Sequence, residues 1–229
     1  CFINVCHPPK NYIGCKELYE QNRILDIPDI SVNYDDYLNL IDSEIKKFPE
    51  PLIHIVRLNS INFDYMVTLF CKKFPDSTYE EYTLEGISTT ELDDLLLEKP
   101  FITTFIFLKE KARCSQTLSS KKYLGLLVDR SSPFDDVNTQ SLIGRFCGYN
   151  DNGQSKIISC IASVEKYLQL IKDDFNNNTI EWNSNTTYNI DGMTDSYGTI
   201  NSQFTNMEQQ IADSIKTIEF TSYEQTILW

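Results

Sequence analysis

The sequence lacks the marks of membrane, secreted and metal-binding proteins. It contains no run of the roughly 18 apolar residues that span a bilayer, and segment 1–18 has no apolar core of a signal peptide. Only two histidines occur, His7 and His54, and none of the seven cysteines forms a CxxC pair, so we expect no metal site. The odd cysteine count, without disulfide-framework spacing, predicts reduced thiols in a cytoplasmic, intracellular compartment, with a viral or virion-associated location as the other option. The missing apolar run predicts no membrane contact.

Phosphate-binding motifs are also missing. The chain has no GxxxxGK[ST] loop and no acidic strand motif in a plausible place to hold Mg²⁺. We therefore expect that this chain does not hydrolyse ATP on its own. It opens on Cys1 rather than methionine, which favours a fragment, a processed product or the ordered part of a longer protein.

The composition indicates a globular protein with an uneven charge. The 229 residues are 41% hydrophobic and 12% aromatic, enough for one domain of about 150 residues with appendages. The formal net charge of −13 would repel a phosphate backbone. Residues 101–150, however, carry seven basic against four acidic side chains, whereas residues 172–229 carry two against nine. We expect any anion site in the middle segment.

Apolar strand-like segments alternate with amphipathic helical segments along the chain. This alternation predicts an α/β fold with an open parallel sheet covered by helices. The expected strands are 51–58, 78–84, 101–109, 122–130 and 155–162, and the expected helices are 33–48, 62–74, 88–99, 135–149 and 163–175. We divide the chain into an irregular N-terminal linker segment with a helix (1–50), the α/β domain (51–175) and an Asn-rich loop with a polar C-terminal extension (176–229).

Three expected strands end in residues suited to binding phosphates. Because functional groups collect beyond the carboxyl ends of parallel strands, these loops are the candidate site. They contain Arg57, Asn59 and Ser60 after the first strand, Lys109, Lys111, Arg113, Ser115 and Thr117 after the third, and Gln140, Gly144 and Arg145 after the fourth.

The order of these motifs resembles the C-terminal motor domain of superfamily 2 helicases, the second of their two RecA-like domains. "TQSLIGRFCGY" (139–149) is similar to the arginine-bearing helix of that domain, "KARCSQTL" (111–118) to the preceding loop, and "HIVRLNS" (54–60) to its first strand. "NYIGCKEL" (11–18) looks like the linker from the first motor domain. The subgroup most similar is that of phages and large DNA viruses, whose pattern is matched by Asp136, Gln140, Gly144, Arg145, Gly148 and Tyr149. The resemblance covers roughly residues 10–170.

The resemblance implies a role for each candidate residue. Arg145 and Gln140 would act catalytically on the γ-phosphate of ATP, where a cationic guanidinium can be worth on the order of 10³–10⁵ in rate. Gly144 and Thr117 would lie at the nucleotide. Single-stranded nucleic acid or a duplex junction would contact Lys109, Lys111, Arg113, Arg57 and Asn59. ATP and Mg²⁺ would be held mainly by a first motor domain absent from this chain, in the same polypeptide or complex.

The pattern departs from the family in three places, and simpler interpretations exist. Gly148 stands where many relatives carry a second arginine, Asn150 where some carry another, and Gln140 lies one residue further from the glycine than usual. Arg145 would, without the pattern, be expected to pair with Asp135 or Asp136. The alternative functions are a helicase-derived structural or protein-interaction module without ATPase activity, and a small-molecule-binding α/β domain. His54, in mid-strand, is expected to be a hydrogen-bonded core histidine.

Overall fold

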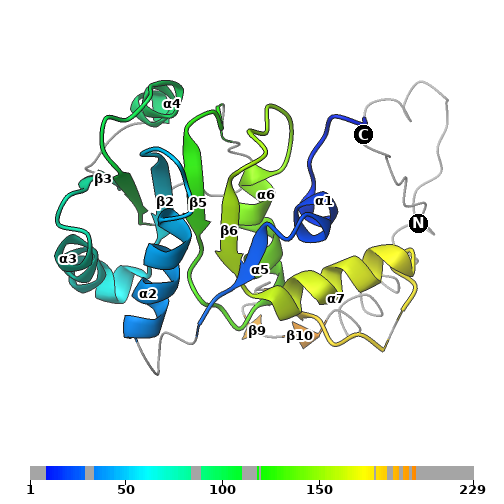
Figure 1. Ribbon diagram of the computed structural model, residues 1–229. Helices are drawn as coiled ribbons and strands as arrows, with labels where there is room; N and C mark the ends of the chain where they lie inside the picture. Colours follow the sequence, from blue (N-terminus) through cyan, green and yellow to red (C-terminus); the bar gives the residue numbers. More distant parts are fainter. Residues whose placement is uncertain are drawn as a thin grey trace, which may run out of the picture.

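A six-stranded sheet, parallel throughout, forms the centre of the fold, with strand order β1-β6-β5-β2-β4-β3 (Figure 1). The computed structural model describes residues 9–28, 34–83, 89–109, 118, 120–177, 179–184, 188–190, 193–195 and 198–199. The strands of the sheet are β1 (Ile24–Asp26), β2 (Ile53–Arg57), β3 (Thr78–Tyr82), β4 (Thr104–Leu108), β5 (Leu124–Val128) and β6 (Lys156–Ser159). The helices are α1 (Cys15–Glu20), α2 (Tyr34–Ile45), η1 (Ser60–Asn62), α3 (Phe63–Lys73), α4 (Thr89–Leu97), α5 (Asp135–Gln140), α6 (Leu142–Phe146) and α7 (Ile161–Lys172). None of the described helices is long and apolar enough to cross a membrane.

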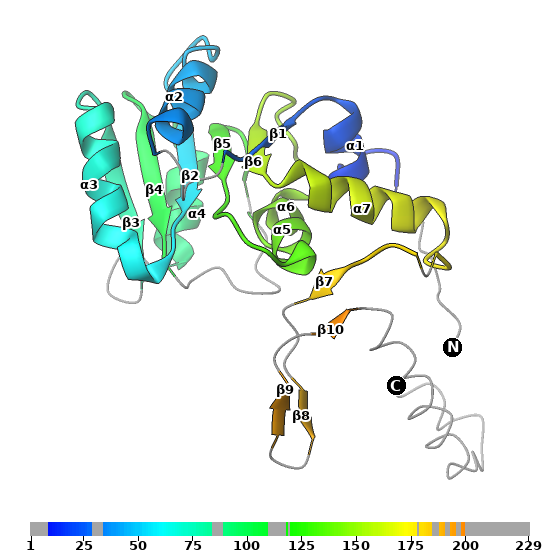
Figure 2. The same cartoon turned by 90° about the horizontal axis from the view of Figure 1, so that it is seen from below.

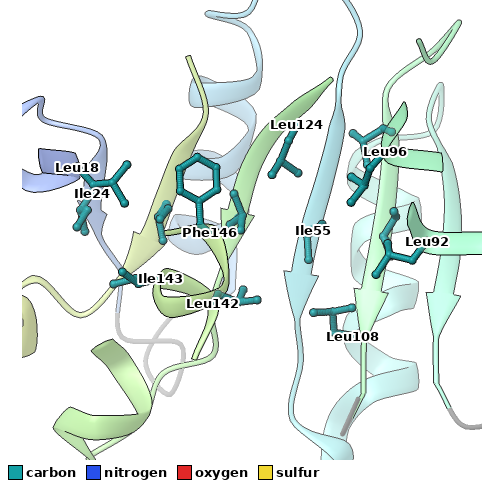
Figure 3. Packing of buried hydrophobic residues seen from close by; sticks show 14 of the residues in the cluster. Leu18, Ile24, Ile55, Leu92, Leu96, Leu108, Leu124, Leu142, Ile143 and Phe146 are labelled. Atoms are coloured by element: carbon teal, nitrogen blue, oxygen red, sulfur yellow. The ribbon is translucent and has the colours of Figure 1, made fainter. Parts of the chain in front are cut away.

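Helices cover both faces of this sheet and create two hydrophobic cores. On one face, α2 and α3 pack through residues such as Ile41 and Phe70. On the other face, the buried residues come from α1, α4, α6 and α7, and Figure 3 shows Leu18, Leu96 and Phe146 among them. Because both faces are covered, the central strands are continuous apolar runs rather than alternating ones. The predicted open parallel α/β sheet covered by helices is confirmed, and it is consistent with a RecA-like fold.

Three expected elements differ from the structure. The strand expected over 155–162 ends at Ser159, and α7 already begins at Ile161. The helix expected over 135–149 is two helices, α5 and α6, which meet at Ser141 with φ −74° and ψ −106°. The break has a cause, since the buried Asp129 carboxylate accepts the Leu142 amide at 3.3 Å and so satisfies the start of a second helix. The strand expected from residue 101 begins only at Thr104, and Phe101 is 98% exposed.

The sheet also extends beyond the range 51–175. Strand β1 pairs in parallel with β6, with Leu25 opposite Ile158, and α1 and α2 pack into the two cores. The linker segment therefore contributes structure to the α/β domain. After α7, the chain returns along α5: Trp182 is buried, and the Asn183 amide donates to Asp135 at 2.9 Å. Figure 2 shows this stretch as β7 (Asn183–Ser184), paired with β10 (Gly198–Thr199), with the separate hairpin of β8 (Tyr188–Ile190) and β9 (Met193–Asp195) below.

A histidine is built into the middle of the sheet at a β-bulge. The pairing of β2 with β5 shifts register, because Ile53 lies opposite Leu124 but Ile55 lies opposite Leu127. His54 faces this bulge, and its Nδ1 accepts the Leu126 amide at 2.9 Å. Its ring leaves no space for a side chain at Gly125, where a Cβ would lie 2.5 Å from His54 Cε1. The expected core histidine is confirmed, and burial lowers the pKa of His54 to about 3, so the ring is neutral.

Candidate nucleic-acid interface and arginine helix

Three cations lie in a row along the carboxyl edge of the sheet. Lys109 directly follows β4, Arg57 ends β2, and Arg130 lies two residues after β5. These strands are neighbours in the order β4-β2-β5, and parallel strands lie about 4.8 Å apart, so the row spans about 10 Å. We call these three residues the cationic row. Sequence reasoning identified Lys109 and Arg57 but missed Arg130, although it also stands just beyond the carboxyl end of an apolar strand.

Each cation of the row has a described neighbour that orients it. The Lys109 Nζ lies 5.0 Å from the centre of the Phe63 ring, a cation–π contact. Arg57 Nη1 lies 3.4 Å from a carboxylate oxygen of Asp129, and Arg130 Nη1 lies 3.4 Å from the side-chain oxygen of Asn59. All three side chains are partly exposed. The row therefore offers positive charge at the surface rather than in the core.

Beside the row is a hollow of about 500 Å³. It is lined by Asn59, Ser60, Ile61, Asn62 and Arg130, which come from η1 and its flanks and from the loop after β5. Asn59, predicted from the sequence, therefore lies in the same place as Arg130. Ile61 and Asn62 carried no signal in the sequence, because their position at the surface depends on the 3₁₀ turn between β2 and α3.

A fully buried carboxylate connects the row to the helix that bears Arg145. Asp129 is 0% exposed, and it accepts hydrogen bonds from the amides of Arg130 at 2.8 Å and of Leu142 at 3.3 Å, in addition to its contact with Arg57. Burial raises the pKa of the Asp129 carboxyl above its ordinary value, although Arg57 and the two amides lower it. One side chain thus holds the end of β2, the end of β5 and the start of α6 together.

The residues predicted to face ATP have different environments. Gln140, the last residue of α5, is exposed, and Gly144 in α6 is exposed as well. Among the described residues, a Cβ at Gly144 would meet only the Thr139 carbonyl, at 3.9 Å, so no close approach within the described part of the chain requires a glycine there. Arg145 is only 7% exposed, and its carbonyl accepts the Leu118 amide at 3.4 Å.

That hydrogen bond places the end of the predicted nucleic-acid loop beside α6. Lys111, Arg113 and Thr117 themselves lie outside the described residues.

At the start of α5, the Asp135 carboxylate accepts hydrogen bonds from Ser163 at 2.6 Å and from Lys166 at 3.0 Å, besides that from Asn183. Asp135 therefore has a structural role where α5 meets α7 and the C-terminal extension.

The linker segment is attached to the chain that follows α6. Ile13 and Gly148 exchange two backbone hydrogen bonds, of 2.9 and 2.8 Å. Gly148 has φ +128°, a conformation that favours glycine. A second attachment lies ten residues after Ile13. There the two terminal nitrogens of Arg23 donate to the two carboxylate oxygens of Asp151 at 2.6 and 2.7 Å, which makes a bidentate ion pair. Burial alone would raise the pKa of Asp151, but hydrogen bonds and charge from Arg23 lower it. We call these contacts the linker latch.

The aromatic ring of Phe146, the last residue of α6, lies against the latch. The Arg23 guanidinium lies 5.4 Å from the ring centre and the Lys121 Nζ 5.0 Å from it. Lys121 is buried and donates to the Tyr149 carbonyl at 3.0 Å, and burial lowers its pKa. The basic residues of segment 101–150 therefore lie in two different places. Lys121 is buried and has a structural role, whereas Lys109 and Arg130 are partly exposed at the carboxyl edge of the sheet.

The described cysteines do not form a reactive centre. Cys15, Cys71, Cys147 and Cys160 are free thiols. Burial raises the pKa of Cys15 to about 12 and that of Cys147 to about 11, in the second case despite Lys121, so both are protonated and poor nucleophiles at neutral pH. Over the described ranges, no three side chains of His, Cys, Asp or Glu are grouped as metal ligands.

Comparison with known proteins gives a viral relative. The chain is 26% identical over 192 residues to an uncharacterized protein of Acanthamoeba polyphaga mimivirus, an alignment that covers 74% of this chain and 45% of the relative. The chain thus spans less than half the length of that protein. No protein-family model matches the chain, and no solved structure matches it.

Proposed function

We propose that this chain is the second motor half of a nucleic-acid-dependent ATPase of helicase type, from a virus. The observation that carries the proposal is the cationic row, which three neighbouring strands present at one edge of a parallel α/β sheet, together with the attached helix that bears Arg145. The similarity to a mimivirus protein supports a viral origin. Because that relative is more than twice as long as the matched part, a further domain is available to such a protein.

The row suits the backbone of a single strand. Its three cations span about 10 Å, which allows contacts to successive phosphates, and phosphate contacts give affinity without sequence preference. The formal charge of −13 opposes such binding over the whole molecule, so the proposal depends on this local concentration of positive charge. We expect binding that weakens steeply as salt is added.

The nucleotide would be shared with another domain. Gln140 and Arg145, on consecutive helices, would supply an amide and a guanidinium to its phosphates. Both described carboxylates of α5 are already bound within the chain: Asp135 by Ser163 and Lys166, and Asp136 by the Ser184 hydroxyl and the Val137 amide. Arg145 is 7% exposed, and its proposed role therefore requires a shift of α6 or its neighbours when the two domains close.

A salt titration of binding tests the nucleic-acid part. The affinity for a fluorescently labelled single-stranded oligonucleotide is measured by anisotropy at several salt concentrations. Three phosphate contacts predict a slope of about −2 in log K against log salt, and replacing Lys109 or Arg130 by alanine reduces that slope by about 0.7 each. The predicted but undescribed Arg113 is tested in the same way. Arg57→Ala is less suitable, because it would remove the guanidinium beside the buried Asp129 carboxylate and so destabilise the fold as well.

Lys99→Ala is the matched control. Lys99 precedes β4 at the amino edge and forms an exposed ion pair with Glu50, so its removal should leave binding unchanged. Absence of binding by the parent chain at every salt concentration would reject the nucleic-acid role. Equal losses for Lys99→Ala and the row variants would show that the charge acts without a defined interface.

The alternative is an interaction module derived from a helicase. Two observations favour it: Arg145 is buried, and apolar side chains lie exposed near the amino edge, with Leu97 59% and Phe101 98% exposed. The reading frame upstream of the codon for Cys1 separates the two functions. A GxxxxGK[ST] loop followed by an acidic Mg²⁺ motif supports the motor, whereas an unrelated sequence together with absent nucleic-acid binding supports the module.

A further inference from the structure

Ile61 is the most exposed large apolar residue in the part of the chain that the structure describes. It is 101% exposed, at the centre of the 3₁₀ turn η1 that follows β2. The turn is anchored on its far side, because Phe63 is 2% exposed and begins α3. The side chain of Ile61 is therefore fully exposed to solvent on a short turn whose next residue is buried, rather than on a long loop.

The groups around Ile61 are polar and positively charged. It lines the hollow of about 500 Å³ together with Asn59, Ser60, Asn62 and Arg130. Lys109 lies over the ring of Phe63, two residues along the chain. An apolar contact beside two cations, an amide and a hydroxyl matches the chemistry of a nucleotide unit, which has a charged phosphate and an apolar base face.

We propose that Ile61 packs against a base of single-stranded nucleic acid whose phosphates lie along the cationic row. This inference rests on the proposed function and adds to it a contact that does not depend on charge. Apolar side chains that contact or wedge between bases tolerate any sequence, because every base has an apolar face. Ile61 would hold an unstacked base in register while Arg130 holds the adjoining phosphate at the hollow.

An apolar contact of Ile61 and a phosphate contact of Arg130 affect different quantities in the salt titration, namely the affinity and the slope of log K against log salt. Ile61→Ser should weaken binding of the labelled strand about fivefold or more, with an unchanged salt slope, because no counterion is released by an apolar contact. Arg130→Ala should instead reduce the slope by about 0.7. Ile61→Phe should bind at least as tightly as the parent chain, because bases stack on aromatic rings.

Phe101→Ser provides the matched control. Phe101 is equally exposed, at 98%, but precedes β4 at the opposite edge of the sheet, so its replacement should leave affinity unchanged. Both sites are exposed, and equal melting temperatures verify that the variants fold. Parental affinity in Ile61→Ser with weakened binding in Arg130→Ala overturns this inference and leaves the proposed function standing. No binding by the parent chain overturns both.

Discussion

Single residues in this chain show how one sequence pattern can serve both packing and chemistry. Gly148 and Tyr149 belong to the pattern that resembles a helicase motif. In the structure, Gly148 has a backbone conformation that few other residues adopt, and Tyr149 meets Tyr12 edge to face, with ring centres 5.6 Å apart. Both residues therefore have a structural role in holding the linker segment. The proposed nucleotide site therefore rests on Gln140 and Arg145 rather than on Gly148 and Tyr149.

The sequence correctly predicted that His54 is buried and hydrogen-bonded, but it did not predict the β-bulge and the glycine that accommodate its ring. An apolar run that contains one histidine indicates a buried ring with a hydrogen-bond partner. It does not reveal that β2 and β5 slip by one residue at that point, or that Gly125 is required by the ring of His54. Those facts depend on pairing between residues about 70 positions apart, which a pattern along one chain does not contain.

The buried His54 predicts a specific loss of stability in acid. Its pKa is about 3 in the folded chain and 6.5 ordinarily, so the unfolded chain takes up a proton first as pH falls. Stability from the neutral ring is complete above pH 6.5 and declines between 6.5 and 3, by about 1.4 kcal/mol for each pH unit. The free energy of unfolding in urea, measured across this range, should decline less steeply in His54→Gln.

Glutamine is the suitable comparison because its side-chain oxygen can accept the Leu126 amide and does not titrate. Carboxylates titrate in both chains, so only the difference between the two pH profiles reports on His54. The imidazole resonances of His54 should also stay constant between pH 8 and 5. Parallel profiles, or a ring that titrates near 6.5, would contradict a neutral buried histidine.

At the scale of elements, local pattern was enough for the strands and insufficient for the ends of helices. The central strands β2, β4, β5 and β6 lie within expected segments, because continuous apolar runs are typical of covered parallel sheets. The break between α5 and α6 is made by Asp129, which lies 12 residues before Ser141. The three-residue strand β1 is recognisable only through its pairing with β6. Both depend on tertiary contacts.

The linker latch is predicted to stabilise the domain as a coupled unit. Arg23→Met should lower the free energy of unfolding by about 3 kcal/mol, because it leaves the largely buried Asp151 carboxylate without its partner. Asp151→Asn should also destabilise, and the double variant should lose less than the sum of the two. Arg23→Lys should recover only part, since an ammonium cannot form both hydrogen bonds to Asp151 and also reach the Ser155 carbonyl.

The measurement is a double-mutant cycle in denaturant. Lys16 and Glu20 serve as the control pair, because they lie 3.9 Å apart on α1 with both side chains 60% exposed, and such pairs contribute little. Additive losses for Arg23→Met and Asp151→Asn would show that the pair does not act as a unit. A loss at Lys16 as large as that at Arg23 would show that any charge change in the linker segment destabilises the fold.

At the scale of the whole molecule, the negative charge of the C-terminal part opposes the proposed interface. The cationic row lies on a chain whose formal charge is −13, and residues 185–229 carry six acids and one lysine. The extension is attached to the domain before this acidic part begins, through the buried Trp182 and through Asn183 on α5. The acidic part is therefore tethered to the same α/β domain as the row, and its charge acts against a nucleic acid that approaches.

A shortened chain that ends at Ser184 is therefore predicted to bind single strands more tightly at low salt. This shortened chain keeps Trp182 and lacks residues 185–229, whose net charge is −5, so its formal charge is −8. The gain should disappear at high salt, because screening reduces the interaction of charges further apart than the Debye length, about 10 Å at 0.1 M. A full-length variant with the six acids changed to amides separates charge from length. If charge is the cause, both variants gain, and the amide variant, with a formal charge of −7, gains at least as much as the shortened chain. A gain in the shortened chain alone would mean that the extension covers the row, and no gain in either would contradict the electrostatic explanation.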